Sequence, residues 1–266
     1  MTTPISAVIT TYNNSDTLVD CLDSLAFADE LLVLDSLSED ASPAIARAKG
    51  ARLEQQAFAG YGLQKQKAID LASHDWVLLL DADERLSPEL ADEIIALLQA
   101  GPDCTGYKIP RREWLYWRWQ HPATRLVDPV RLFDRRHARM NQVPVHAAIE
   151  LDGKAGQLRG SILHLGERNV TLKVEKINYY SSGLVEHKLA AKPHFLRTRM
   201  VFYPAFAFLR EYLLRRQFLN GWAGFIAARS SAFYAFIKYA KVFEAQRAKE
   251  PPVASGKTAI LPEDES

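Results

Sequence analysis

The first hundred residues alternate short apolar runs with amphipathic stretches, and this alternation restricts the folds open to the chain. Apolar runs at 5–10, 31–35 and 76–81 are too short for stable helices and are typical of strands. Between the first two runs, leucines recur at helical spacing over residues 18–25. Strands that alternate with helices form a mostly parallel sheet with helices on both faces. We therefore predict an α/β domain whose ligands bind at the carboxyl ends of its strands.

The pattern changes after Gly101. Short β-like runs occupy residues 105–110, 130–134, 147–153 and 161–165. We expect them to add strands and walls to one side of the same sheet.

The sequence becomes helical from about Val170. We predict three regions: the α/β domain at 1–168, a helical region at 169–249, and a disordered tail at 250–266, which is polar and contains proline.

Composition narrows the class of protein. The 33 basic and 32 acidic residues nearly cancel, so charge does not indicate a nucleic-acid-binding protein. The two cysteines, Cys21 and Cys104, lack CxxC spacing, which disfavours a zinc cluster or disulfide framework.

The N-terminus lacks the features of a secretory signal. The longest uncharged stretch of the C-terminal third, residues 217–228, is shorter than the roughly 20 residues of a membrane span. We expect a cytoplasmic protein.

The apolar run at 76–81 leads into three acids, Asp81, Asp83 and Glu84. Like charges at the mouth of an apolar element repel one another and lose hydration, so the arrangement indicates a bound cation. Carboxylates two residues apart can point the same way and hold Mg²⁺ or Mn²⁺, leaving positions for phosphate oxygens. The alternative is a surface acid cluster at the N-terminus of the helix that follows Ser87.

The loop after the first strand, residues 10–16, contains no glycine. A dinucleotide-binding fold would place GxGxxG there, and no GxxxxGK[ST] loop occurs elsewhere in the chain. Because backbone amides do not supply the usual diphosphate site, a metal is the expected counter-charge.

Polar clusters follow the strand-like runs: TTYNN at 10–14, LDSLSED at 34–40, the pair Gln64–Lys65, and LLLDADE at 78–84. Together they resemble the family 2 glycosyltransferases of the GT-A fold, and the resemblance extends along almost the whole chain. Later segments, including YKIPRR, VRLF and FLNGW, are similar to the branch that builds the lipopolysaccharide inner core. That branch includes β-1,4-glucosyltransferases acting on a heptose.

The resemblance implies a pocket for the donor nucleotide. Its residues would be Thr11, Tyr12, Asn13, Asp35, Gln64 and Lys65. The first three would line the uridine pocket, Asp35 would recognise the uracil or ribose, and the Gln64–Lys65 pair would lie near the nucleotide. The alternatives are turn formation for Asn13 and Asp35, and a solvated surface charge for Lys65.

For the metal, the resemblance implies Asp83 as the principal ligand and Asp81 as a contact to ribose or metal. His146 would supply a second ligand or a diphosphate contact, although Ala147 departs from the VHE pattern that is usual in the branch. His164 could act similarly, but we expect it to be a hydrogen-bonded core histidine.

The reaction implied is an inverting transfer in one displacement, in which a carboxylate takes the proton of the acceptor hydroxyl. Asp128 matches an acid at that place in the branch, with Glu113 and Glu84 as alternatives. The alternative role of Asp128 is structural, as an acid in a turn that precedes Pro129. Three arginines have two possible roles: Arg131, Arg111 and Arg112. They would neutralise phosphates of the donor or the acceptor, or they would be solvated surface charges.

The C-terminal region is basic and aromatic. Residues 195–243 carry fourteen aromatic side chains, and residues 192–249 contain eleven Lys or Arg against two acids. Such helices suit a membrane interface, which predicts a peripheral protein at the cytoplasmic face of the inner membrane. The alternative is a helical pair that packs on the catalytic domain or on a second subunit.

These features predict a metal-dependent, inverting glycosyltransferase. It would move a sugar, with glucose as first choice, from a UDP-sugar to a glycolipid or lipopolysaccharide-core acceptor, without a nucleic-acid partner. A nucleotidyltransferase is one alternative, disfavoured by the glycine-free first loop. A noncatalytic membrane-surface scaffold is another, disfavoured by the intact Asp35, Asp81 and Asp83.

Overall fold

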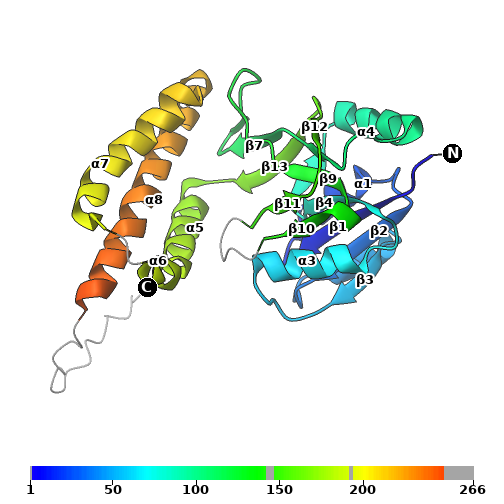
Figure 1. Ribbon diagram of the computed structural model, residues 1–266, viewed down its shortest axis with the longest axis horizontal. Coiled ribbons are helices and arrows are strands. Elements are labelled where there is room, and N and C mark those ends of the chain that lie inside the picture. Colours follow the sequence, from blue (N-terminus) through cyan, green and yellow to red (C-terminus); the bar gives the residue numbers. More distant parts are fainter. Residues whose placement is uncertain (1, 142–146, 192–193, 249–266) are drawn as a thin grey trace, which may run out of the picture.

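A computed structural model describes residues 2–141, 147–191 and 194–248. The strands and their covering helices form one part, on the right of Figure 1, and the helices after residue 169 form a second part on the left. Strand β13, Ile162–Glu167, leads from the first part into the second.

The largest sheet among the described residues has seven strands in the order β12-β6-β9-β4-β1-β2-β3. Strands β3, β2, β1 and β4 run parallel, β9 is antiparallel to both of its neighbours, and β12 is parallel to β6. The bounds are β1 Ile5–Thr11, β2 Glu30–Asp35, β3 Arg52–Gln55, β4 Trp76–Asp81, β6 Gly106–Lys108, β9 Val130–Asp134 and β12 Ala155–Gln157. The predicted α/β domain with a mostly parallel sheet is confirmed.

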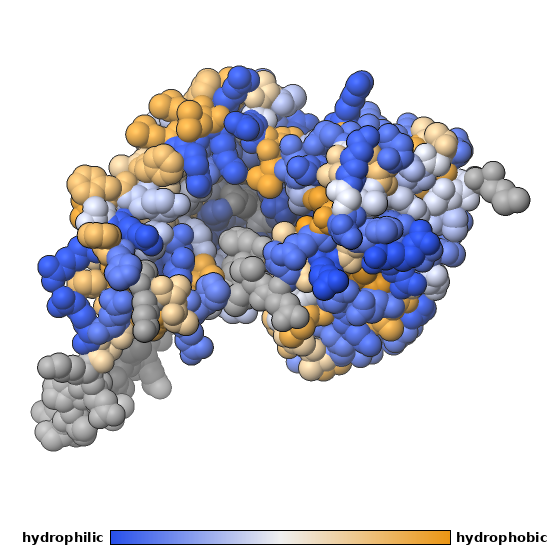
Figure 2. All heavy atoms as spheres, viewed as in Figure 1, coloured by the Kyte–Doolittle hydropathy of each residue, from blue (hydrophilic) through white to orange (hydrophobic). Residues whose placement is uncertain are grey.

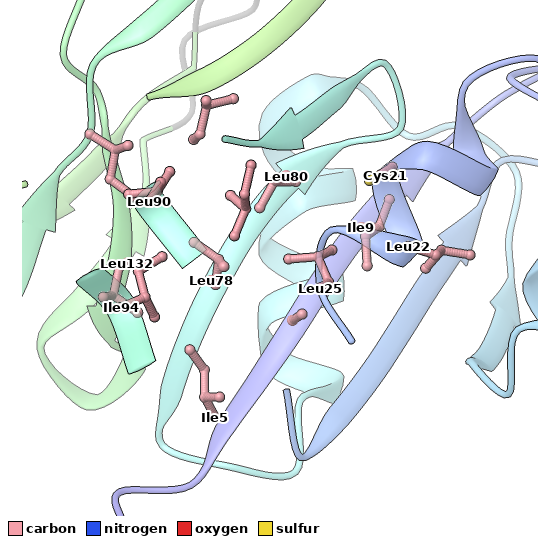
Figure 3. Close-up of a cluster of buried hydrophobic side chains, with 14 of the residues drawn as sticks. Ile5, Ile9, Cys21, Leu22, Leu25, Leu78, Leu80, Leu90, Ile94 and Leu132 are labelled. Carbon is pink, nitrogen blue, oxygen red and sulfur yellow. The ribbon is translucent and has the colours of Figure 1, made fainter. Parts of the chain in front are cut away.

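Helices cover both faces of this sheet. They are α1 Leu18–Asp23, α2 Ser42–Ala48, α3 Tyr61–Leu71 and α4 Pro88–Ala100. In β4, Leu78 and Leu80 pack with the side chains of α1 and α4 (Figure 3), whereas Val77 and Leu79 pack with those of α3. Burial on both faces explains why this strand is apolar throughout, since a half-exposed strand would alternate with polar residues.

Side-chain caps define some helix ends. Ser87 accepts a hydrogen bond from the Leu90 amide at 3.3 Å and caps α4, and Gly101 ends that helix with a φ of 83°. Helix α2 begins at Ser42 without a side-chain cap, and the Ser42 hydroxyl oxygen accepts a hydrogen bond from the Asn14 amide at 2.9 Å.

Of the four later β-like runs, those at 105–110 and 130–134 supply β6 and β9 to the large sheet, as expected, whereas those at 147–153 and 161–165 supply strands to two other sheets. Strands β5 Glu84–Leu86, β7 Arg111–Leu115, β8 Arg118–Trp119 and β13 form a separate sheet in the order β5-β13-β7-β8. Strands β10 Ala138–Met140 and β11 Ile149–Leu151 form an antiparallel pair, and β10 follows the short helix η1, Arg135–His137. Pro110 stands between β6 and β7 and has no amide hydrogen to donate. Beyond it, Arg111 keeps a single bridge to Val127 while β7 pairs with β13.

The chain is helical from Val170, as predicted. Helices α7 Leu196–Leu209 and α8 Gly221–Arg247 lie side by side as a hairpin (Figure 1), joined by the π-helical turn η2 Arg210–Leu214 and by η3 Gln217–Asn220. Helices α5 Val170–Gly183 and α6 Val185–Ala190 pack on α8. Within the described ranges no helix combines the length and hydropathy that a bilayer crossing requires. The predicted tail at 250–266 lies outside the described residues.

The α7–α8 hairpin is attached to the second sheet by packing and by hydrogen bonds. Leu115 of β7 packs against Ala223 of α8. The buried Asn220 donates to the Thr124 hydroxyl at 3.0 Å and accepts from the His121 amide at 2.7 Å. The loop that leads toward Asp128 is therefore fixed to the helical region.

Candidate active site

The carboxyl ends of β1, β2 and β4 meet at one edge of the large sheet. Thr11 pairs in register with Asp35, and Thr10 pairs with Asp81. Because β9 runs antiparallel to β4, Asp128, two residues before the start of β9, lies at the same edge. Residues far apart in the sequence are thus brought together where the topology predicts a ligand.

Asp35 is fully buried and is held by donors from two elements. Its carboxylate accepts hydrogen bonds from the Ser38 amide at 3.0 Å, the Ser38 hydroxyl at 2.5 Å and the Gln55 side chain at 2.9 Å. The Asn13 amide donates to the Ser38 hydroxyl oxygen at 2.8 Å, and Asn13 adopts a φ of 52°. Ser38, which sequence reasoning missed, links the first two strand ends, and its polar loop gave no signal of that role.

The other candidate nucleotide residues differ in exposure. Tyr12 is 58% exposed and presents its ring to solvent, whereas the neighbouring Thr11 is buried. Gln64 is also buried, where it donates to the Ser36 hydroxyl at 3.0 Å and accepts from Gln56 at 2.7 Å. Tyr12 is therefore accessible to a ligand, while Gln64 supports the loops beneath the edge.

Asp81 is surrounded by cations. The ammonium group of Lys65, on α3, lies 2.6 Å and 2.8 Å from its two carboxylate oxygens, and the guanidinium of Arg131 lies 3.4 Å away. Burial raises the pKa of Asp81, but the charges of Lys65 and Arg131 outweigh it and hold this pKa well below its usual range. Asp81 is thus an ionised carboxylate in a fixed position.

A buried ion pair lies beneath Asp81. Arg131, from β9, contacts the carboxylate of Glu84 at 2.8 Å, and the other carboxylate oxygen of Glu84 accepts from the Asp81 amide at 3.0 Å. Glu84 and Arg131 are both buried. Arg131 therefore orients the acidic turn from below, and at 6% exposure it offers little surface to a phosphate.

Asp83 belongs to a second charge cluster. His164, from β13, lies 3.3 Å from the Asp83 carboxylate and 2.5 Å from that of Glu113, and Glu113 also pairs with Arg111 at 2.8 Å. Burial opposes the charged histidine, but these two acids raise the pKa of His164 to about 10. Burial likewise opposes ionisation of Glu113, and His164 and Arg111 lower its pKa to about 2. His164 is thus paired through both ring nitrogens, one with Asp83 and the other with Glu113.

The three candidate bases differ in how their charge is used. Glu84 and Glu113 are engaged in the ion pairs described above. Asp128 is exposed, and within the described ranges it has no ion pair or side-chain hydrogen bond. Among these acids, Asp128 has the side chain most available to a hydroxyl from solvent.

The guanidinium groups of Arg111 and Arg112 both contact other groups of the protein. Arg111 pairs with Glu113 and lies 3.4 Å from Glu84, and the Arg112 guanidinium donates to the Gln120 carbonyl at 2.6 Å. His146, a predicted metal ligand, lies outside the described residues.

Asp81 and Asp83 have the chemistry that suits a divalent ion. Burial raises the pKa of Asp83, but the hydrogen bond from His164 outweighs it and lowers the pKa, so both carboxylates are ionised at neutral pH. Ionised carboxylate oxygens are ligands that Mg²⁺ and Mn²⁺ prefer. Across residues 2–141, 147–191 and 194–248, no three His, Cys, Asp or Glu side chains form a ready-made metal cluster.

Comparison with known proteins identifies the family of the chain. The profile described as Glycosyl transferase family 2 matches residues 6–166, which is more than half of the chain. The lipopolysaccharide core biosynthesis glycosyltransferase LpsC of Rhizobium meliloti (strain 1021) is 30% identical over 94% of this chain and 95% of its own length. An uncharacterized glycosyltransferase of Rickettsia felis is 30% identical over 90% of this chain and 89% of its own.

Solved structures overlap the chain only in part. Glucosyl-3-phosphoglycerate synthase from Mycobacterium tuberculosis, crystallised with Mn²⁺, UDP and glucosyl-3-phosphoglycerate, is 26% identical over 42% of this chain and 44% of its own, with a TM-score of 0.35. Mannosyl-3-phosphoglycerate synthase from Rubrobacter xylanophilus is 26% identical over 42% and 41%, with a TM-score of 0.37. The family profile and the full-length relatives show that this chain is a family 2 glycosyltransferase with the GT-A fold.

Proposed function

We propose that this glycosyltransferase transfers glucose from UDP-glucose, with inversion, to a hydroxyl of a lipid-linked saccharide such as the lipopolysaccharide inner core. It would do so as a peripheral protein at the cytoplasmic face of the inner membrane. The observation that carries the proposal is the meeting of Asp35, Asp81 and Asp83 at one sheet edge beside the exposed Asp128. The full-length similarity to LpsC supports the acceptor class, since that relative is described as a lipopolysaccharide core enzyme.

The donor nucleotide would bind at the ends of β1 and β2. Tyr12 offers an exposed ring for the base. Asp35 is fully buried, so it would act on the uracil or ribose through Ser38 and Gln55, which its carboxylate holds in place. Because these partners are already held, little reorganisation is needed when a uracil or ribose group binds.

The acidic turn would carry the diphosphate end of the donor. Asp83 would be the principal ligand of Mg²⁺ or Mn²⁺, with Asp81 close by and held in place by Lys65 and Arg131. When bound, the ion supplies positive charge that stabilises the departing diphosphate. Lys65 adds a second positive charge on the same side.

Asp128 would act as the base. The acceptor oxygen forms a bond to the anomeric carbon, the bond from that carbon to the diphosphate oxygen breaks, and UDP leaves. The proton of the acceptor hydroxyl passes to the Asp128 carboxylate. This single displacement inverts the anomeric configuration and needs no covalent sugar intermediate.

The test is an incubation of the purified protein with a panel of nucleotide sugars, Mn²⁺ or Mg²⁺, and truncated inner-core lipopolysaccharide. Asp83→Asn is expected to weaken UDP-sugar binding. Asp128→Asn should keep donor binding yet lower the turnover number by about 10²–10⁴-fold, as expected for loss of a general base. Asp75→Asn is the matched control, because Asp75 precedes the opposite end of β4 and pairs with the exposed Arg136.

Each result bears on a separate part of the proposal. Full turnover in Asp128→Asn would move the base to another residue. Absence of Mn²⁺-dependent UDP binding by the unaltered protein would overturn the proposed reaction and favour a noncatalytic scaffold.

A further inference from the structure

An apolar stripe runs along the outer side of α7 and η2. Phe202, Phe206, Leu209 and Leu213 follow one another at spacings of four, three and four residues, so they share one helix face. Each is more than half exposed, between 51% and 67%. The opposite side of α7, which includes Tyr203, packs on α8. The stripe is therefore a second apolar face that the fold leaves in solvent.

The stripe continues around the corner of the hairpin. Leu214, Phe218 and Trp222 are 66%, 45% and 75% exposed at the turn between α7 and α8. Figure 2 shows hydrophobic side chains gathered over this upper end of the hairpin. Turns between helices in water-soluble proteins are usually polar, so an apolar corner indicates a surface that is covered by something.

The charges around the corner are mainly positive. Arg210, Arg215 and Arg216 lie there with a single acid, Glu211. Glu211 is buried and lies 2.8 Å from Arg210 and 3.7 Å from Arg215, whereas Arg216 is exposed. The apolar corner therefore has a cationic rim and no exposed carboxylate among residues 209–222.

This combination favours an anionic lipid surface over a second copy of the chain. A two-fold contact through the corner would place its arginines against the same arginines of the partner, and like charges repel. In a bilayer, leucine and phenylalanine reach the acyl chains, tryptophan lies at the headgroup level, and arginine meets lipid phosphates.

We infer that the stripe and corner, Phe202 to Trp222, form a membrane-docking surface that inserts into the interface of an anionic bilayer, with Leu213, Leu214 and Trp222 as its deepest residues. Its purpose rests on the proposed function, because a lipid-linked acceptor is met at that interface. The loop at His121–Thr124, hydrogen-bonded to the buried Asn220 at the same end of the hairpin, leads to Asp128. Docking would thus hold the edge that carries Asp128 close to the lipid surface.

The experiment is sedimentation of the full-length protein with vesicles. One set contains phosphatidylglycerol in phosphatidylcholine, and the other contains phosphatidylcholine alone. The protein should pellet with the anionic set and less so at high salt, because the arginine contribution is screened. The double variant Leu213→Ser with Leu214→Ser should weaken vesicle binding by about tenfold for each leucine. The reason is that each substitution removes the free energy gained when a leucine side chain moves from water into the bilayer. The matched control is Leu172→Ser with Val174→Ser, which removes exposed apolar side chains of α5, away from the stripe.

Three results would overturn the inference: no pelleting with anionic vesicles, equal pelleting of the two double variants, or a solution dimer that only Leu213→Ser with Leu214→Ser dissociates. The last would assign the corner to a second copy of the chain. UDP binding with Mn²⁺, measured on the same samples, should be unchanged in both double variants. Loss of UDP binding in all samples would refute the proposed reaction and leave the docking result standing.

Discussion

At the scale of single residues, the acids of the candidate active site depend on charges buried beneath them. Glu84 has a fully buried side chain and is paired with the nearly buried Arg131. The same carboxylate accepts the amide of Asp81, so the acidic turn and the ion pair are one unit. A change beneath the turn is therefore expected to affect both folding stability and donor binding.

Glu84→Gln should lower the free energy of unfolding by about 3 kcal/mol, because it removes the carboxylate 2.8 Å from the buried Arg131 and leaves only Asp81, 3.4 Å away, as its counter-ion. Urea denaturation measures this loss. Asp75→Asn removes a surface ion pair with Arg136 and should change stability by no more than about 1 kcal/mol. Similar losses in the two variants would contradict the buried network.

The Glu113–His164 pair should make the stability of the metal-free protein depend on pH. The folded pKa of Glu113 is lowered from 4.5 to about 2, so its contribution is complete above pH 4.5 and is lost as pH falls through the folded pKa. The folded pKa of His164 is raised from 6.5 to about 10, so its contribution is complete below pH 6.5 and is lost as pH rises through that value. The pair should contribute most between pH 4.5 and 6.5.

Melting temperatures in EDTA, measured from pH 3 to pH 10 on the parent and on His164→Asn, would test this expectation. The difference between the two proteins should be greatest inside the stated window and shrink on both sides. A difference that stays constant across the range would show that the pair is not charged as described.

At the scale of elements, the joint between the helical hairpin and the second sheet decides where the loop before Asp128 lies. Asn220 is 1% exposed, and its side chain bonds to Thr124, His121 and, at 2.9 Å, Gln217. One buried amide thus ties η3 to the loop that precedes β9. No apolar contact could replace it without leaving the His121 amide unpaired.

Asn220→Ala should cost about 1–3 kcal/mol of stability, because buried donors and acceptors lose their partners. Hydrogen exchange should quicken at residues 121–125, while UDP binding at the other strand ends should be retained. Ser231→Ala, on the adjoining helix α8, is the control, since it removes only a bond to the Ala227 carbonyl. Unchanged exchange in the loop would show that the joint does not position it.

At the scale of the whole molecule, the proposed donor site and the proposed docking surface belong to different parts of the chain. The strand-end acids belong to the large sheet, and the apolar corner belongs to the α7–α8 hairpin (Figures 1 and 2). Donor binding and lipid binding should therefore be separable by mutation.

UDP with Mn²⁺ should raise the melting temperature of the full-length protein, because a ligand of the folded state adds about 2.7 kcal/mol at a hundredfold excess over its dissociation constant. Asp35→Asn should reduce the shift, and Leu213→Ser with Leu214→Ser should not. Thermal denaturation followed by fluorescence measures both. A shift that survives Asp35→Asn in full would place the nucleotide elsewhere.

Part of the fold and of the candidate active site could be predicted from the sequence, because that part depends on local patterns. The apolar run of β4 required burial on both faces, and parallel topology required Asp35 and Asp81 to meet at one edge. The helical region was evident from its spacing, and the family resemblance named Asp83 and Asp128 as candidates. These inferences need only the period of a strand or helix and the direction of the chain.

Tertiary structure alone decided which partners each polar group has. Glu84 meets Arg131 across 47 positions, and His164 meets Glu113 across 51, and neither pairing leaves a periodic trace in the sequence. The three residues of β5 join β13 rather than the large sheet, and no local pattern in the sequence indicates that pairing. The exposed stripe on α7 likewise became visible only once the opposite face was seen packed on α8. Local sequence fixes which faces are apolar, but only packing determines which of them remain uncovered.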